Sequence, residues 1–238
     1  MKRIRYVLWG LAVCSLIGIV ALFRYPIRDT LTKAVLVSSV IVVLVAFISL
    51  FPTRRSKLIM TCFLLIPLLA MAFAPQRSMN AGKLRAEYVR RLTSYEGVEY
   101  VWGGETHRGV DCSGLVRAAW FETLRQRGWT EKDPGSFREA FRIWWFDSSA
   151  QELGRGYSGR TQRILEATNV RTIDTSRLVA GDLAVVARGV HVMGYLGNNE
   201  WIEADPGIHR VIRIKSNDKN SWLDSSAVVV RWNILTNR

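Results

Sequence analysis

Apolar and polar positions divide the chain into a membrane-like first part and a mixed second part. Three uncharged apolar runs extend from Tyr6 to Phe23, from Ala34 to Phe51 and from Leu58 to Ala74, and each is 17 or 18 residues long. That length is near the lower limit for a helix that crosses a bilayer. Soluble helices rarely continue for four turns without a polar face, so a buried globular hairpin is the weaker interpretation. We predict an all-α membrane segment of three spans over residues 1–74.

The pattern after residue 74 is that of a soluble α+β domain. Residues 75–82 form a short polar linker, after which Leu84, Tyr88 and Leu92 recur at helical spacing until Gly97. Five later segments rich in β-branched and apolar residues are predicted as strands: Leu183 to Arg188, His191 to Leu196, Trp201 to Ala204, Val211 to Lys215 and Ala227 to Ile234. Helices followed by a run of strands predict helices packed on an antiparallel sheet over residues 83–238, with a helical insertion at about residues 125–175.

The charge distribution follows the same division. Of the 238 residues, 49% are hydrophobic and 22% are charged, which excludes a disordered chain and a wholly membrane-embedded channel. The first 74 residues hold nine of the 33 basic residues and one of the 20 acidic residues, so they carry +8 of the formal net charge of +13. This charge flanks the apolar runs and concerns membrane insertion, so it does not indicate a nucleic-acid partner.

The basic residues give no clear orientation for the spans. Those before the first run and between the second and third runs favour the cytoplasm for both: Lys2, Arg3, Arg5, Arg54, Arg55 and Lys57. The loop between the first and second runs contains Arg24, Arg28 and Lys33, and more basic residues follow the third run. Three spans place the C-terminal domain opposite the N-terminus, so its side depends on what it does. Three runs in succession also argue against removal of the whole segment as a signal peptide.

Cys112 is the strongest candidate for chemistry in the second part. Glycines precede it and good helix formers follow from Val116 to Leu124, so the thiol is expected to open a helix. Free N–H groups at a helix start favour a thiolate, and glycines let a substrate come close. Cys14 and Cys62 lie within the apolar runs, so Cys112 has no disulfide partner in its domain. The histidines and cysteines lack the close spacing of a zinc site, and the sequence indicates neither a metal nor another cofactor.

Four motifs around this cysteine resemble the NlpC/P60 family of papain-like cysteine peptidases. In the family's order they are Tyr100-Val-Trp-Gly-Gly104, Asp111-Cys-Ser-Gly-Leu-Val116, Ala180-Gly-Asp-Leu183 and His191-Val-Met-Gly-Tyr-Leu-Gly197. The resemblance covers about residues 81–232, apart from the insertion. It implies a papain-like α+β fold and an enzyme that hydrolyses amide bonds in the peptidoglycan peptides of bacterial cell walls, typically after γ-linked D-glutamate.

The resemblance also implies roles for individual residues. Cys112 would be the nucleophile and His191 its base, because a neighbouring imidazole forms the thiolate. Tyr100 would help to hold the oxyanion or the substrate near it, and the backbone N–H of Cys112 would supply part of the oxyanion hole. Asp111 and Ser113 would bind the free amine of the peptide.

The third catalytic position departs from the family pattern. The family usually has His, Asn or Gln twelve residues after the base, whereas this chain has Glu203, which can accept the other N–H of His191 and stabilise its cation. Asp205 is the alternative. Strand parity supplies a test, because either acid shares the face of His191 only if the hairpin loop has an odd number of residues, such as Gly197 to Asn199. A two-residue loop is expected to turn both acids away.

These features predict a multi-pass enzyme in the bacterial cytoplasmic (inner) membrane, with the lipid bilayer and peptidoglycan peptides as its partners. The catalytic domain is expected on the outer, periplasmic face, because its polymer lies there. Two alternatives remain open. The fold also suits a thiol acyltransferase or lipid hydrolase at the membrane, and the changed third residue also fits a catalytically silent binding module.

Overall fold

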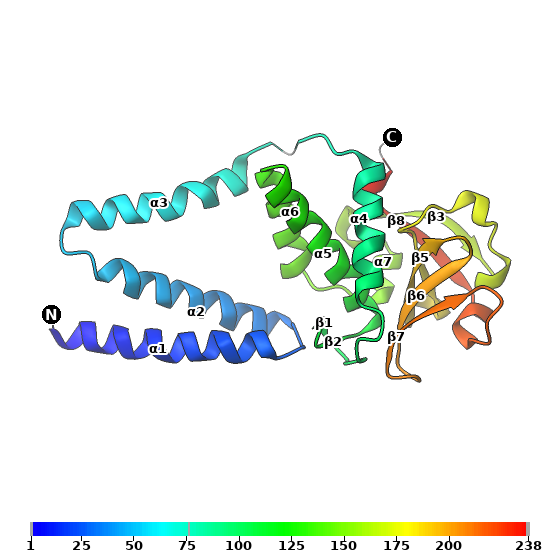
Figure 1. Cartoon of the computed structure of the whole chain (residues 1–238), viewed down its shortest axis with the longest axis horizontal. Helices are drawn as coiled ribbons and strands as arrows, with labels where there is room; N and C mark the ends of the chain where they lie inside the picture. Colours follow the sequence, from blue (N-terminus) through cyan, green and yellow to red (C-terminus); the bar gives the residue numbers. More distant parts are fainter. Residues whose placement is uncertain (1, 76, 237–238) are drawn as a thin grey trace.

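The computed structural model describes residues 2–75 and 77–236. At the N-terminal end of this described chain, helices α1 (Lys2–Arg24), α2 (Thr30–Ser49) and α3 (Arg54–Phe73) extend away from the rest of the molecule (Figure 1). Each contains a stretch long and apolar enough to cross a membrane. The ends of the predicted runs lie within four residues of the ends of these helices.

Polar contacts fix the ends of the membrane-like helices. Helix α2 begins after Asp29, whose carboxylate accepts a hydrogen bond from the Thr32 N–H at 2.7 Å. The helix thereby starts before the predicted apolar run, and Lys33 belongs to its first turn. At the end of α3, Arg138 from the soluble part donates to the carbonyl oxygen of Ala74 at 2.8 Å. The soluble part therefore contacts the membrane-like helices as well as following them in sequence.

The soluble part packs its helices on one face of an antiparallel sheet. The helices are α4 (Ala81–Ser94), α5 (Cys112–Thr130), α6 (Pro134–Trp145) and α7 (Ala150–Gly154). The strands are β1 (Glu105–Thr106), β2 (Gly109–Val110), β3 (Thr161–Ala167), β4 (Leu183–Val186), β5 (His191–Gly197), β6 (Glu200–Asp205), β7 (Arg210–Lys215) and β8 (Ala227–Trp232). The described strands β3 to β8 form one sheet in the order β3-β8-β4-β5-β6-β7, while β1 pairs with β2. This arrangement confirms the predicted α+β class and its five predicted strands.

The insertion predicted as helical at residues 125–175 is only partly helical. Helices α6 and α7 lie within it, but Thr161–Ala167 forms strand β3, so the expectation of helix is wrong there. Gly156 and Gly159 adopt positive φ angles of 107° and 80°, which interrupt any helical continuation beyond α7. The chain then pairs antiparallel with β8. Pairing in the sheet thus overrides the local helix propensity of Gln-Arg-Ile-Leu-Glu-Ala.

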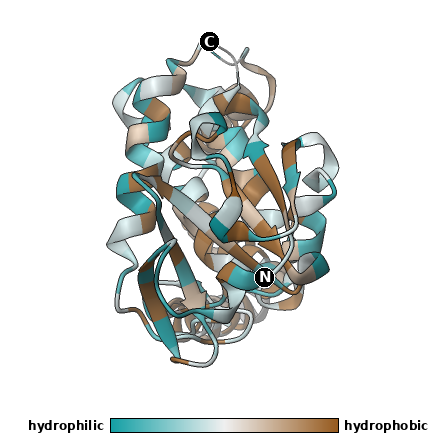
Figure 2. Ribbon diagram, turned by 90° about the vertical axis from the view of Figure 1, so that its right-hand side faces the viewer, coloured by the Kyte–Doolittle hydropathy of each residue, from teal (hydrophilic) through white to brown (hydrophobic). Residues whose placement is uncertain are grey.

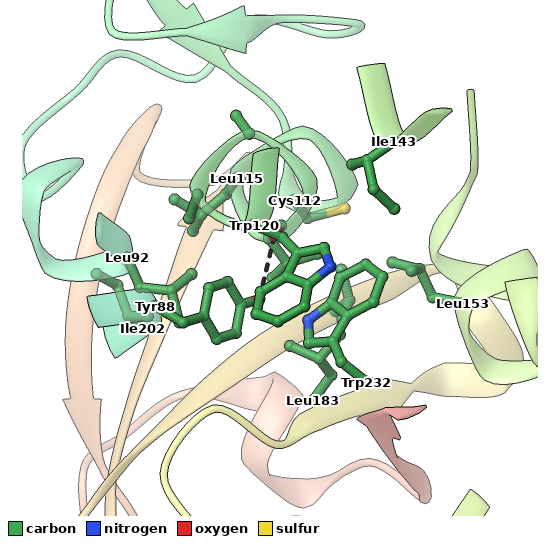
Figure 3. Close-up of a cluster of buried hydrophobic side chains, with 14 of the residues drawn as sticks. Tyr88, Leu92, Cys112, Leu115, Trp120, Ile143, Leu153, Leu183, Ile202 and Trp232 are labelled. Atoms are coloured by element: carbon green, nitrogen blue, oxygen red, sulfur yellow. Dashed lines mark hydrogen bonds between the residues drawn. The ribbon is translucent and has the colours of Figure 1, made fainter. Parts of the chain in front are cut away.

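Aromatic side chains hold helix α5 against the sheet (Figure 3). The ring of Trp120 on α5 stacks on that of Trp232 on β8, with centroids 5.2 Å apart and 11° between the planes. Tyr88 of α4 meets Trp120 edge-on at 5.1 Å, and its hydroxyl donates to the carbonyl oxygen of Val116 at 3.1 Å. Because these side chains are buried and interlocked, they fix the position of α5, whose first residue is Cys112.

The opposite face of the sheet buries a second apolar cluster beneath short 3-10 turns. Met193, Trp201 and Leu223 belong to it. In Figure 2, which views the soluble end, hydrophobic residues are concentrated along the strands and hydrophilic residues on the surrounding loops and helices. Strands β5 and β6 are therefore packed on both faces, which makes them a rigid support for side chains that must be placed accurately.

Candidate active site

Helix α5 presents Cys112 at its first position, where the side chain is almost completely buried. Asp111 caps the helix, since its Oδ1 accepts a hydrogen bond from the Gly114 N–H at 2.6 Å and its Oδ2 accepts one from the Gly103 N–H at 2.8 Å. Only glycine fits at position 114, because a Cβ there would lie 2.0 Å from the carbonyl oxygen of Gly104. The motif glycines thus let the segment before Cys112 close onto the helix start.

Two backbone N–H groups at this helix start are free. In the described part of the chain, the N–H groups of Cys112 and Ser113 donate no hydrogen bond to a protein acceptor. Free donors at a helix N-terminus favour negative charge. They suit both a thiolate at Cys112 and an oxyanion formed beside it.

His191 opens strand β5 and stands between Cys112 and Glu203. Its Nε2 lies 2.5 Å from Oε2 of Glu203, and the ring also interacts with the side chain of Cys112. Burial alone would lower the pKa of His191, but its interactions with Cys112 and Glu203 outweigh burial and raise the pKa to about 9. The imidazole is therefore held as a cation at neutral pH, the state that stabilises a neighbouring thiolate.

The β5–β6 hairpin brings Glu203 to the face of His191 by a route that the parity rule does not anticipate. Its turn has two residues, Asn198 and Asn199, both with positive φ, and not an odd number. A β-bulge after Tyr195 adds one residue to β5 and shifts the register of the ladder. The expectation that a two-residue loop turns the acid away is therefore wrong, because the bulge restores the parity.

Asp205, the alternative third residue, is engaged elsewhere. Its Oδ1 accepts hydrogen bonds from the N–H groups of Gly207 at 2.6 Å and Ile208 at 2.9 Å. It thereby stabilises the turn that leads into β7. Of the two candidate acids, Glu203 is the one in contact with His191.

Two residues that the sequence does not single out complete the surroundings of His191. Asn220 donates from Nδ2 to Oε1 of Glu203 at 2.7 Å, and its Oδ1 accepts from the Trp222 N–H at 2.9 Å. The ring of Trp222 stacks on the imidazole of His191, with centroids 4.4 Å apart and planes 18° apart. Asn220 thus orients the carboxylate and also the segment that covers the base. The only sequence signal for it is an asparagine able to cap the short helix that follows.

A cleft of about 460 Å³ opens beside Cys112. The residues predicted to bind substrate all line it: Tyr100, Asp111 and Ser113. Trp102 and Val190 also line it and are largely exposed, so they offer apolar contact to a substrate. Among the described residues, no group of three or more His, Cys, Asp or Glu side chains is placed to hold a metal ion.

The polar groups in this cleft differ in their capacity to form new hydrogen bonds with a substrate. Burial, followed by the nearby acidic groups of Cys112, Asp111 and Asp205, raises the pKa of Tyr100 to about 12. The phenol therefore keeps its proton and can donate a hydrogen bond to an oxyanion. Both oxygens of Asp111 already accept protein hydrogen bonds, including one from the Ser113 hydroxyl at 3.0 Å. A bound amine would share this carboxylate with the helix cap.

A cysteine at a helix start, facing a buried His–Glu pair on an adjoining antiparallel sheet, defines the class of papain-like cysteine hydrolases. The profile of the NlpC/P60 family matches residues 97–231, more than half of the chain. The chain therefore belongs to the NlpC/P60 family, as its four sequence motifs predicted.

Two curated proteins and one solved structure are similar to this chain. The murein DD-endopeptidase MepS/murein LD-carboxypeptidase of Escherichia coli K12 is 27% identical over 121 residues, 51% of this chain and 50% of that protein. A probable endopeptidase NlpC homolog of Haemophilus influenzae is 29% identical over 126 residues, 53% of this chain and 51% of that protein. This chain thus spans about half the length of the curated relatives it matches. The peptidoglycan hydrolase RipB of Mycobacterium tuberculosis is 22% identical, with 68% of this chain and 70% of that chain covered and a TM-score of 0.41.

Proposed function

We infer that this chain is a membrane-anchored cysteine amidase or endopeptidase that hydrolyses amide bonds in peptidoglycan peptides. The observation that carries the inference is the buried His191–Glu203 contact of 2.5 Å beside Cys112, at the side of an open cleft. The Escherichia coli relative, named a murein endopeptidase, supports the substrate class, and the Haemophilus influenzae relative, named a probable endopeptidase, supports the type of reaction.

The proposed reaction proceeds through a thioester. His191 already holds the proton of Cys112 as an imidazolium, and the thiolate sulfur attacks the carbonyl carbon of the scissile amide. The N–H groups of Cys112 and Ser113 and the hydroxyl of Tyr100 stabilise the oxyanion. His191 then gives its proton to the leaving amine, and a water molecule that it activates hydrolyses the thioester, which releases the acid and restores the thiol. Glu203 keeps the imidazole oriented and stabilises its cation.

The proposed location is the cytoplasmic membrane, with the catalytic domain on the outer face. The α1–α2 turn lies at the same end of the helices as the soluble part (Figure 1). There Lys33 pairs with Glu105, and the guanidinium of Arg28 donates to the carbonyl oxygens of Leu22 and Tyr25. Because the proposed substrate lies outside the cell, this turn and the catalytic domain are assigned to the outer face. The six basic residues at the opposite end then favour the cytoplasm for that end.

Replacement of Cys112 tests the chemistry. In the full chain reconstituted in nanodiscs, Cys112→Ala should abolish muropeptide cleavage, whereas Cys62→Ala in α3 is the matched control and should retain it. Undiminished cleavage by Cys112→Ala would rule out the nucleophile. An acyl lipid trapped as a thioester on Cys112 would favour an acyltransferase or lipid hydrolase. A thiol that fails to react with a thiol-directed probe near neutral pH would favour a silent binding module.

Surface labelling tests the orientation. A single cysteine introduced by Gln126→Cys on the exposed side of α5, in a chain whose three native cysteines are replaced by alanine, should react with a membrane-impermeant reagent in intact cells. Protection of this position until the membrane is broken would contradict the outer location.

A further inference from the structure

The segment that leads to the nucleophile is attached directly to the membrane hairpin. The Arg28 N–H donates to the carbonyl oxygen of Gly103 at 3.2 Å, and the Glu105 N–H donates to that of Pro26 at 3.1 Å. Gly103 in turn donates its own N–H to Asp111, the residue before the nucleophile. The segment of residues 103–105 therefore links the α1–α2 turn to Asp111, which is next to Cys112.

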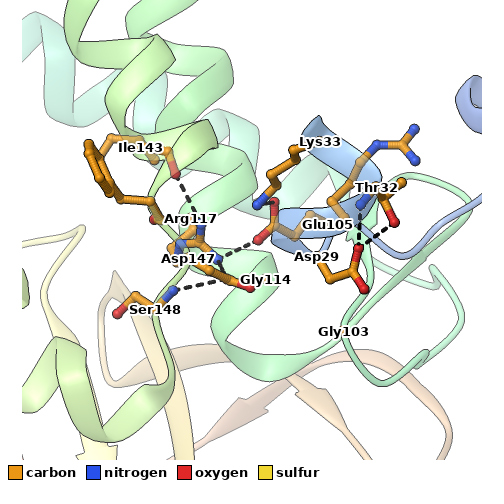
Figure 4. Close-up of polar contacts among 12 residues, drawn as sticks. Asp29, Thr32, Lys33, Gly103, Glu105, Gly114, Arg117, Ile143, Asp147 and Ser148 are labelled. Carbon is orange, nitrogen blue, oxygen red and sulfur yellow. Dashed lines mark hydrogen bonds and ion pairs between the residues drawn. The ribbon is translucent and has the colours of Figure 1, made fainter. Parts of the chain in front are cut away.

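A buried ionic network reinforces this contact (Figure 4). Lys33, in the first turn of α2 and 0% exposed, lies 3.3 Å from Glu105. Glu105 also pairs with Arg117 on α5, and Arg117 pairs with Asp147 and donates to the carbonyl oxygen of Ile143 at 3.0 Å. The network therefore joins the membrane segment, the helix of the nucleophile and the insertion.

A second cavity, of about 410 Å³, adjoins the same network. It shares Glu105 and Arg117 with the active-site cleft, so these side chains stand between the two spaces. Its apolar lining comes from both parts of the chain: Phe23 and Leu36 from α1 and α2, and Phe121, Ile143 and Trp144 from α5 and α6. Because Phe23 is also 63% exposed on α1, the cavity is continuous with the apolar surface that a bilayer would cover.

This cavity combines an apolar lining with a cation. Two carboxylates also line it, but both have cationic partners: Glu105 pairs with Lys33 and Arg117, and Glu122 pairs with Arg91. Arg28 lines it and is 9% exposed, and only Nη1 of its guanidinium donates hydrogen bonds to protein acceptors within the described residues. The remaining N–H groups can donate to an anionic oxygen, for which a phosphate is a suitable partner. The apolar wall suits a hydrocarbon chain. A phosphate-bearing lipid satisfies both requirements at the membrane surface.

We propose that the preferred substrate is a wall peptide still joined to a membrane lipid through a phosphate, and not the finished polymer. The phosphate and the first part of the lipid chain bind in the cavity lined by Arg28 and Leu36, and the peptide reaches Cys112 through the adjoining cleft. The chemical step is unchanged, with water converting the amide into a carboxylic acid and an amine. This proposal rests on the proposed function, because it assumes that Cys112 cleaves wall peptides.

The test compares one peptide in two forms. The full chain in nanodiscs is given the same muramyl peptide either free in solution or as its phosphate-linked prenyl lipid in the disc. The lipid-linked form should be cleaved with a kcat/KM about tenfold higher or more, because anchoring raises its effective concentration beside the cleft. Phospholipid is present in both arms, so occupation of the cavity by bulk lipid alone does not produce the difference.

A substitution that fills the cavity connects the preference to this site. Leu36→Trp should lower the ratio of lipid-linked to free cleavage towards one, whereas Val35→Trp, on the lipid-exposed side of the same helix, should leave the ratio high. Equal cleavage of the two forms by the unchanged chain, or equal loss in both variants, would overturn the lipid-linked substrate alone. Cleavage of neither form would overturn the proposed peptidase function and this inference with it.

Discussion

Two buried glutamates near the cleft, Glu203 and Glu105, hold cations of different kinds. Glu203 contacts His191, whose pKa is raised to about 9, so the cation exchanges its proton within an enzyme's working range. Glu105 contacts Arg117, whose guanidinium does not lose its proton in proteins, and also Lys33. Burial alone would lower the pKa of Arg117, but Glu105 and other acceptors raise it.

We infer from the comparison that the partner decides the role of each carboxylate, which is the proposed catalysis at Glu203 and architecture at Glu105. Around Glu203, the second contact is a neutral amide from Asn220, so His191 is the cation that this carboxylate holds. Around Glu105, the second contact is another cation, and the network joins three separate segments of the chain. Changing the two acids in the same way should therefore affect turnover in one case and stability in the other.

The largest effect is expected from Glu203→Gln, which removes the charge behind the base but keeps its shape. The kcat for muropeptide cleavage should fall about 10³- to 10⁴-fold, because the imidazolium of His191 loses its stabilising anion. Steady-state kinetics measure the loss, and a thermal melt checks folding. Asp205→Asn is the matched control and should cost about tenfold or less, since it keeps an acceptor for the turn. A larger loss in that control would assign the third position to Asp205.

The same change at Glu105 should act on stability. Glu105→Gln leaves Lys33 and Arg117 buried without their shared anion, so the free energy of unfolding should fall by about 3 to 5 kcal/mol. Denaturation of the nanodisc-embedded chain measures it. Lys33→Met combined with Glu105→Gln should recover part of the loss, because one unpaired cation is removed. Strictly additive effects at the two positions would contradict the network.

The pH dependence of the contact between His191 and Glu203 gives a further test of this contrast. The folded-state pKa is raised from 6.5 to about 9, so the stabilisation that the pair contributes is complete below pH 6.5 and is lost as pH rises to about 9. Above that pH, kcat/KM should fall about tenfold per unit, since the leaving amine no longer receives a proton. Glu203→Gln should move this alkaline limb to lower pH. If the alkaline limb of the pH profile stayed in place in this variant, Glu203 would not be the acid that sets the pKa of His191.

The smallest effect is expected where a neutral contact supports the catalytic acid. Asn220→Ala removes the hydrogen bond to Oε1 of Glu203 and should lower kcat about tenfold with little change in KM. Asn217→Ala, at an exposed position in the same loop, is the matched control and should leave both constants unchanged. If Asn220→Ala lowered the melting temperature without lowering kcat, its role would be structural only.

Local patterns were sufficient to predict most of the fold and the places of Cys112 and His191. The glycines before Cys112 and the helix formers after it belong to one stretch, and His191 begins a strand that its own residues specify. Residues 161–167 escaped prediction because their strand depends on pairing with β8, which no local pattern reveals. The face of the sheet on which Glu203 lies depends on a β-bulge after Tyr195. Only the pairing register of β5 with β6 shows that bulge.

The contacts around the site were harder to predict because they join distant segments. Asn220 and Trp222 lie in a polar loop without a motif, yet they orient the acid and cover the base. Lys33 looks like one more loop charge in the sequence, whereas in the structure it is buried against Glu105. Each of these pairings forms only through tertiary packing, so one sequence alone carries no sign of it.

The Lys33–Glu105 pair also sets an order for biosynthesis. Lys33 precedes Glu105 by 72 residues in the chain. Since chains grow at about 5 to 20 residues per second, Lys33 is made roughly 4 to 14 seconds before the carboxylate of Glu105. Until then the ammonium must extend to the water at the membrane surface. The hairpin is thus in place first, and the newly made soluble part folds against it.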